Sequence, residues 1–198
     1  MLELPKIDHA LEEAASKTCF FTEGEFEGRK VRVSRANYLA LLSMRGAEIP
    51  AEVERLRSLF KEVPEKTLEA DLISLLAALN WRYHNIACVF IALGFSSSHI
   101  LEALWMRIKE GSWVSPQLAA TAALVDPNFK VKASELVLSS STHYKSTVSL
   151  AELLRTQHKA RFLWGTARSN ILAAKKQDRD NSGAIALGWL ESLQNAIA

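Results

Sequence analysis

The feature of this sequence that most limits its fold is an echo between two segments 32 residues apart, from 81 to 113. The segment NWRYHNIA at residues 80–87 is matched by SWVSPQLA at residues 112–119, so that Trp81 corresponds to Trp113. Each segment places an apolar, helix-like run after a polar cap. The pair LA at 150–151 follows at the same interval, without a tryptophan, as a third copy. This pattern predicts a short helical repeat.

Composition extends the helical prediction to the whole chain. A chain of 198 residues is long enough for one domain with a substantial core. Leucine and alanine are abundant, and only eight glycines and five prolines interrupt them, which favours helices over sheet. The exception is residues 19–34, where Gly24 and Gly28 interrupt a charged stretch and apolar residues alternate with basic ones. We therefore predict an all-α single domain over residues 1–198, with a small hairpin or extended loop near 19–34.

The chain divides into three parts. Residues 1–64 contain N-terminal helices and the loop, residues 65–138 form the repeat-like core, and residues 149–198 hold a long basic helix and a C-terminal capping helix. Between them, the serine- and threonine-rich residues 139–148 are typical of an exposed connection. The run at 86–93 is apolar around the whole circumference of a helix, so we expect it to be covered on both sides.

Local signals set the expected ends of several helices. Ser34 is a candidate cap for the helix that follows the loop, and Gly111 suits the position after a helix end. Ser149, with Glu152 three residues later, matches a capping box at the start of the long basic helix, which we expect to run to about residue 177.

Features of other protein classes are missing from the sequence. Cys19 and Cys88 lie far apart and form no ligand spacing, which is typical of a reducing cytoplasm. The N-terminus lacks the basic start and apolar centre of a signal peptide, and the longest apolar run, 86–95, is about half the length of a transmembrane helix. We predict a cytoplasmic protein that makes no contact with a membrane.

No motif in the sequence indicates a reaction. The five histidines form no HxxxH or HExxH pattern, and there is no glycine-rich phosphate loop, no GxSxG and no cysteine nucleophile motif. We therefore predict no catalytic residues, no metal and no cofactor. An enzyme whose site is assembled from distant residues remains an alternative.

Two groups of residues are candidates for binding a partner. Tryptophans and arginines gather at 81–82 and 105–113, and these residue types are favoured in interface hot spots; the alternative is that the tryptophans pack between repeats. Residues 127–179 carry ten bases and three acids, which suits an acidic partner or a polyanion, although bases on solvated helix faces are common. The partner-binding candidates are Arg82, His84, Arg107, Arg155, Lys159, Arg161 and Arg168.

The tryptophan segments, NWR at 80–82, GSWVSPQLA at 111–119 and DPNF at 126–129, resemble HEAT-like helical repeat proteins. The resemblance covers about residues 65–138, with a shorter interval than a usual HEAT unit, and it implies a stack of antiparallel helix pairs with about 8–10 helices. The chain also looks like the small helical proteins encoded beside secreted bacterial toxins as their immunity partners. That likeness implies a non-catalytic bacterial protein that binds a cognate toxin domain and occludes its active site. The alternative is a nucleic-acid-binding helical repeat protein that uses the basic C-terminal third.

Overall fold

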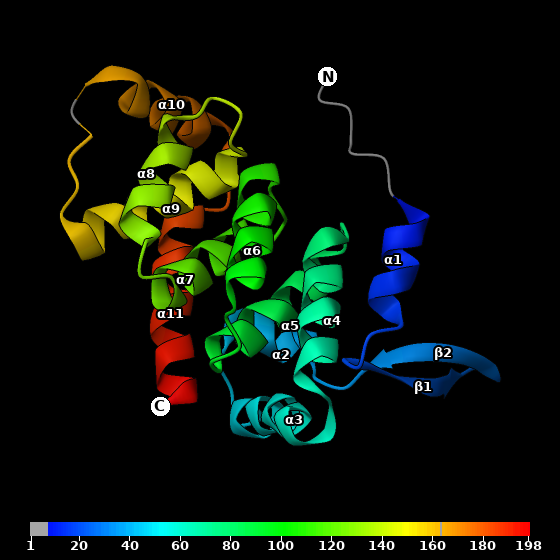
Figure 1. Ribbon diagram of the computed structural model, residues 1–198. Coiled ribbons are helices and arrows are strands. Elements are labelled where there is room, and N and C mark those ends of the chain that lie inside the picture. The colour runs from blue at the N-terminus through cyan, green and yellow to red at the C-terminus, as the bar shows by residue number, and fades with distance from the viewer. Residues whose placement is uncertain (1–7, 163) are drawn as a thin grey trace.

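The computed structural model describes residues 8–162 and 164–198, and within them the chain forms eleven helices and one two-stranded sheet (Figure 1). The elements are α1 (His9–Ser16), β1 (Phe21–Phe26), β2 (Arg29–Ser34), α2 (Tyr38–Ser43), α3 (Ile49–Glu62), α4 (Glu65–Ala77), α5 (Trp81–Ala92), α6 (Ser98–Glu110), α7 (Ser115–Val125), α8 (Phe129–Leu138), α9 (Tyr144–His158), α10 (Gly165–Gln177) and α11 (Ser182–Ile197). The prediction of an all-α fold with a small hairpin is confirmed.

The hairpin forms where the glycines and the alternating residues predict it. Strands β1 and β2 pair antiparallel, and Glu27 and Gly28 connect them with φ angles of 52° and 74°. A two-residue turn with two successive positive φ angles matches the right-handed twist of the strands that it connects. Ser34 is the last residue of β2, so its prediction as a helix cap is wrong. The cap of α2 is Asn37, whose Oδ1 accepts a hydrogen bond from the Leu39 N–H at 3.1 Å.

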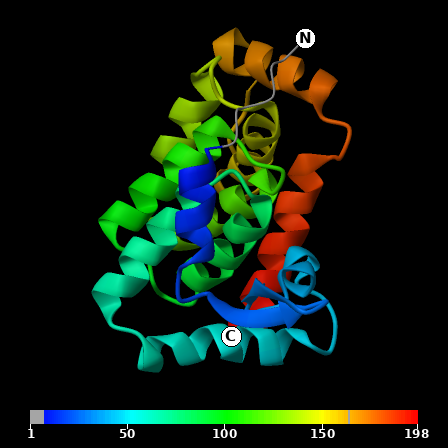
Figure 2. The same ribbon diagram turned by 90° about the vertical axis from the view of Figure 1, so that its right-hand side faces the viewer.

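The helices are arranged in three layers (Figures 1 and 2). Helices α5, α7 and α9 form the middle layer, in which α7 packs against both others. Helices α4, α6 and α8 each pack against the middle helix that follows them in the chain. On the other side, α11 packs along α9 and α7, and α2 packs on α5. Helix α10 lies across the ends of α8 and α9, far from α3 at the other end of the stack.

The sequence echo corresponds to equivalent places in this middle layer. Ile86 in α5, Leu118 in α7 and Leu150 in α9 stand at the repeat interval, and all three are buried. The alanines that follow them are also buried, and their small side chains let neighbouring helices approach closely. The predicted run at 86–93 is buried from 86 to 91 and partly buried at 92 and 93, so this part of the chain is covered on both sides.

Two predictions for the C-terminal third are wrong. The second half of the expected exposed connection at 139–148 belongs to α9, which begins at Tyr144. Ser149 lies inside α9 and donates to the carbonyls of Lys145 at 2.8 Å and Ser182 at 3.2 Å, so it makes no capping box. A serine can occupy the interior of a helix when its hydroxyl donates to the carbonyl one turn earlier. The packing of α9 against α11 favours this helical position for Ser149.

The predicted long basic helix is two helices. Helix α9 ends at His158, where Lys159 takes a left-handed conformation with φ 52°, and α10 begins at Gly165 with φ 78°. This break separates two helices that pack against each other, and it accounts for a helix count above the expected range.

Both cysteines are free thiols. Burial raises the pKa of Cys88 and of Cys19 to about 12, so neither is a thiolate at neutral pH. Cys88 is fully buried in α5 and packs as a small core residue. Among the described residues, no helix has both the length and the apolar character that crossing a membrane requires.

Candidate functional site

Four side chains from three separate segments form what we call the tryptophan surface: Tyr38, Trp81, Arg82 and Trp113. The rings of Trp81 and Trp113 are 4.7 Å apart between centroids, and Tyr38 meets Trp81 edge to face at 5.7 Å. The Arg82 guanidinium carbon lies 4.9 Å from the Trp81 centroid and 5.3 Å from that of Tyr38. Trp113 is 55% exposed, so a large aromatic ring is open to solvent beside a stacked arginine.

Short capping contacts place the two tryptophans at the same level of adjacent helix pairs. Asn80 caps α5 through its side chain, which fixes Trp81 as the first residue of that helix. Before α7, the Ser112 N–H donates to Ser115 Oγ at 2.9 Å, and Ser115 Oγ donates back to the Ser112 carbonyl at 2.8 Å. This turn holds Trp113 between the two serines. The echo in the sequence thus becomes a pair of neighbouring rings on the surface.

The tryptophans of this region have different roles. Trp105 is buried, and its indole N–H donates to Asp126 Oδ2 at 2.6 Å. It is a packing residue between α6 and the start of α8, as the alternative interpretation predicted. Trp113 is exposed, and Trp81 is half-buried beneath it and Arg82. The packing interpretation therefore fits Trp105 and does not fit Trp113.

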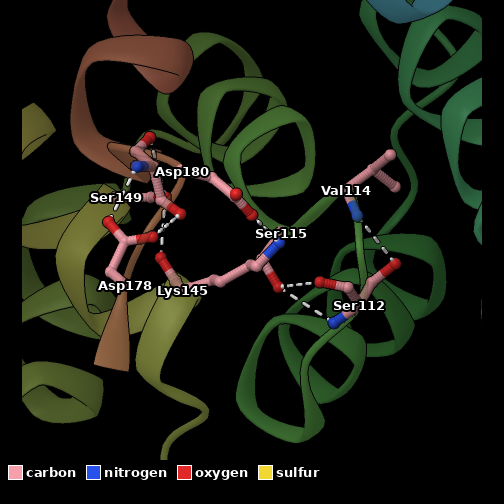
Figure 3. Close-up of polar contacts among 8 residues, drawn as sticks. Ser112, Val114, Ser115, Lys145, Ser149, Asp178 and Asp180 are labelled. Carbon is pink, nitrogen blue, oxygen red and sulfur yellow. Dashed lines mark hydrogen bonds and ion pairs between the residues drawn. The ribbon is translucent and has the colours of Figure 1, made fainter. Parts of the chain in front are cut away.

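A cavity of about 840 Å³ adjoins the tryptophan surface and includes Trp113 in its wall. Lys145 lines it from the start of α9, and Asn170 and Gln177 line it from α10. Lys145 is 7% exposed, and its Nζ pairs with Asp180 Oδ2 at 2.6 Å and lies 5.8 Å from the centroid of the Trp113 ring. Figure 3 shows this ion pair together with the Ser112–Ser115 turn. The buried ammonium is thus neutralised by a carboxylate at the protein surface, as burial of a charge requires a partner.

His143 and Gly111 meet at the wall of the same cavity. Gly111 has φ 92°, and a side chain at this position would overlap the His143 ring. The ring also packs on Tyr144 at 4.5 Å between centroids. Burial and the Lys145 charge lower the pKa of His143, so the imidazole is neutral at pH 7. Its Nδ1 is buried and has no hydrogen-bond partner among the described residues.

Ser112 and His84 form the contact in this region that most resembles catalytic machinery. Ser112 Oγ lies 2.7 Å from His84 Nδ1, and His84 Nε2 lies 2.8 Å from the Ala78 carbonyl oxygen. A carbonyl only accepts, so Nε2 carries the proton and the serine hydroxyl donates to Nδ1. Burial, reinforced by the Arg107 charge, lowers the pKa of His84 to about 3. A general base works best with a pKa near the operating pH, so His84 is poorly suited to activating a nucleophile. Its two hydrogen bonds instead hold the segment before α7 against the segment that follows α4.

The candidate residues His84 and Arg107 are buried, which contradicts the expectation that they lie on the surface. His84 is fully enclosed by the contacts just described. Arg107 donates from Nε to the Leu76 carbonyl at 2.7 Å and from Nη2 to the Ala77 carbonyl at 3.0 Å. It satisfies the last turn of α4, whose carbonyls have no partner within the helix. Arg82 is the exposed residue of the three.

The four basic candidates of the C-terminal third are only partly brought together. Arg155, Arg161 and Arg168 line a second cavity, of about 420 Å³, between α9 and α10. Lys159 is exposed at the end of α9 and does not line it. Lys175, on α10, completes the group. The break between α9 and α10 makes this gathering possible, because on one continuous helix residues 155 and 175 would lie about 30 Å apart.

Sequence reasoning missed Tyr38, Ser112, His143 and Lys145. Nothing near Tyr38 in the sequence indicates that α2 lies beside the start of α5. The sequence did not single out Lys145 and His143 as site residues, because their serine- and threonine-rich surroundings resemble a loop. The apolar spacing of Val148 and Ala151 was the available signal, since it continues the helix back beyond Ser149.

Within residues 8–162 and 164–198, no group of three or more histidine, cysteine, aspartate or glutamate side chains is placed to hold a metal ion. Comparison with known proteins found no matching family model, no matching curated protein and no matching solved structure. The geometry of these sites is therefore the basis on which function is inferred.

Proposed function

We propose that this chain is a non-catalytic protein-binding module that contacts its partner through the tryptophan surface. The observation that carries the proposal is the exposed Trp113 ring, which contacts Trp81 with the two ring planes tilted by 54° and has Arg82 close by. Tryptophan, tyrosine and arginine dominate the energetics of protein interfaces, because they bury large areas and retain a polar contact. All three residue types meet on this surface.

The rings of this surface are ordered before any partner arrives. Trp81 begins a capped helix, and the Ser112–Ser115 turn holds Trp113. Association costs about 0.5–1.5 kcal/mol for each flexible side chain that becomes immobilised, and rings already packed against one another avoid most of this cost. The Arg82 guanidinium lies over two rings, and a guanidinium suits a planar acceptor such as a carboxylate.

The partner class to test first is a secreted bacterial toxin domain. The resemblance to immunity proteins supports this choice, and it implies a bacterial, cytoplasmic protein that occludes the active site of the toxin. A stack of helix pairs suits such a role, since its exposed residues can change without altering the core.

The test is co-expression with the product of the neighbouring reading frame, followed by calorimetric titration of the purified pair. Trp113→Ala should weaken binding by about 2 kcal/mol or more, roughly 30-fold in Kd, as for an interface hot spot. Arg82→Ala should weaken it in the same direction. Trp164→Ala is the matched control, because Trp164 is 80% exposed and lies at the start of α10.

Two outcomes would refute the proposal. One is that the neighbouring product does not bind the wild-type protein. The other is that Trp113→Ala and Trp164→Ala bind equally well. The nucleic-acid alternative uses the basic residues between α9 and α10, and it is tested with the inference that follows.

A further inference from the structure

The second cavity, which we call the basic cavity, has an apolar floor and a charged rim. Its lining residues Val148, Ala151 and Ile171 are buried, and Leu172 beside them is half exposed. The charged residues of the lining, apart from the partly buried Glu152, are exposed. The volume of about 420 Å³ falls within the range of about 300–1,000 Å³ that ligand sites occupy.

The rim of the basic cavity is rich in basic side chains. Four bases line the cavity, against Glu152 as the one carboxylate of the lining. Arg155 donates to both oxygens of Glu152 and so is already paired. In the described part of the chain, Arg161 and Lys175 form no ion pair with a carboxylate within 4.0 Å. The unbalanced charge favours an anionic ligand with more than one negative group.

Glu152 keeps this arrangement in place at neutral pH. The hydrogen bond from Arg155 holds the pKa of Glu152 below its usual value, and the charge of Lys175 acts in the same direction. The carboxylate therefore stays ionised and fixes Arg155 at one side of the rim, while Arg161 and Lys175 remain directed to solvent.

We propose that the basic cavity binds an acidic segment of a protein chain, with one leucine or phenylalanine side chain on the apolar floor and flanking carboxylates on Arg161 and Lys175. This is a second binding site, separate from the tryptophan surface. The floor is the reason to favour a peptide over a nucleic acid. Nucleic-acid bases bind by stacking on open aromatic rings, and the aromatic residue of this lining, Phe162, is partly buried against the core.

The experiment measures fluorescence anisotropy of the labelled peptide acetyl-Glu-Asp-Glu-Leu-Phe-Glu-Asp-amide on the full chain. Its comparison probes are the same peptide with two alanines in place of Leu-Phe, and a seven-nucleotide single-stranded DNA. The variants are Arg161→Glu, to reverse one rim charge, and Leu172→Asp, to place a charge beside the floor. Lys66→Glu, an exposed lysine on α4, is the matched control. Circular dichroism of each variant establishes that it is folded.

We expect saturable binding of the Leu-Phe peptide that weakens about tenfold or more in Arg161→Glu and in Leu172→Asp. Lys66→Glu should change it less than about twofold. Trp113→Ala should leave it unchanged, so that failure here and failure of the proposed function are separate results. The inference is overturned by any of three outcomes: no peptide binding up to millimolar concentration, equal binding of the alanine peptide, or DNA that binds more tightly than the peptide and displaces it.

Discussion

Replacement of His84 by glutamine should remove a defined part of the pH dependence of stability. In the folded protein burial lowers the pKa of His84 to about 3, while the unfolded chain has an ordinary histidine pKa of about 6.5. Below about pH 6.5 His84 binds a proton in the unfolded chain, whereas in the folded protein it binds one only near pH 3. The unfolding free energy therefore falls as the pH falls through this window. Linkage makes the loss about 2 kcal/mol between pH 7 and pH 5.

Glutamine suits this test because its amide offers one donor toward the Ala78 carbonyl and one acceptor toward Ser112, as the neutral imidazole does. Urea unfolding followed by tryptophan fluorescence, at pH 7 and at pH 5, gives the free energies for both proteins. Carboxylates contribute equally to both, so they cancel in the comparison. Wild type should lose about 2 kcal/mol more than His84→Gln. Equal losses would show that His84 takes up its proton at the same pH in the folded and the unfolded protein, and the structural role assigned to it would be wrong.

Other substitutions test the packing around this site. Arg107→Ala should lower the unfolding free energy by about 3 kcal/mol in urea titrations, because it leaves two carbonyls at the end of α4 without donors, and Arg107→Lys should recover only part of the loss; an effect below about 1 kcal/mol would contradict the capping role. Gly111→Ala should cost about 2 kcal/mol or more, seen as a lower melting temperature, because φ is 92° and the new methyl group would overlap His143; an unchanged melting temperature would refute this. Leu118→Ala should cost about 3 kcal/mol, because Leu118 is fully buried in the middle layer, while Leu39→Ala, at a 58% exposed position, should cost less than about 1 kcal/mol.

The two proposed binding sites lie on different parts of the stack and differ in their chemistry. The tryptophan surface belongs to the starts of α2 and α5 and the turn before α7. The basic cavity belongs to α9, α10 and the connection between them. A single large partner could contact both sites, whereas two partners could each use one. Binding of the acidic peptide in the presence of the protein partner separates these two cases by competition.

Local patterns were enough to predict the helical class, the hairpin and the end of α6 at Gly111. The turn at Glu27 and Gly28, and the end of α6 at Gly111, depend on conformations that a few neighbouring residues determine. The repeat interval likewise survives in the structure, because positions such as Ile86 and Leu118 must face the same middle layer in successive helix pairs.

Tertiary structure decided where the polar residues lie. Arg107 reads as a surface arginine in its own segment, and it is buried because the carbonyls that it satisfies belong to α4. Ser149 matches a helix cap in its own segment, and it lies inside α9, where its hydroxyl donates to the Ser182 carbonyl of α11. The tryptophan surface needs Tyr38 from α2 beside Trp81, a contact between segments about 40 residues apart. A sequence window records the conformational preference of its own residues, but the burial of a polar group depends on a partner that only the folded chain brings to it.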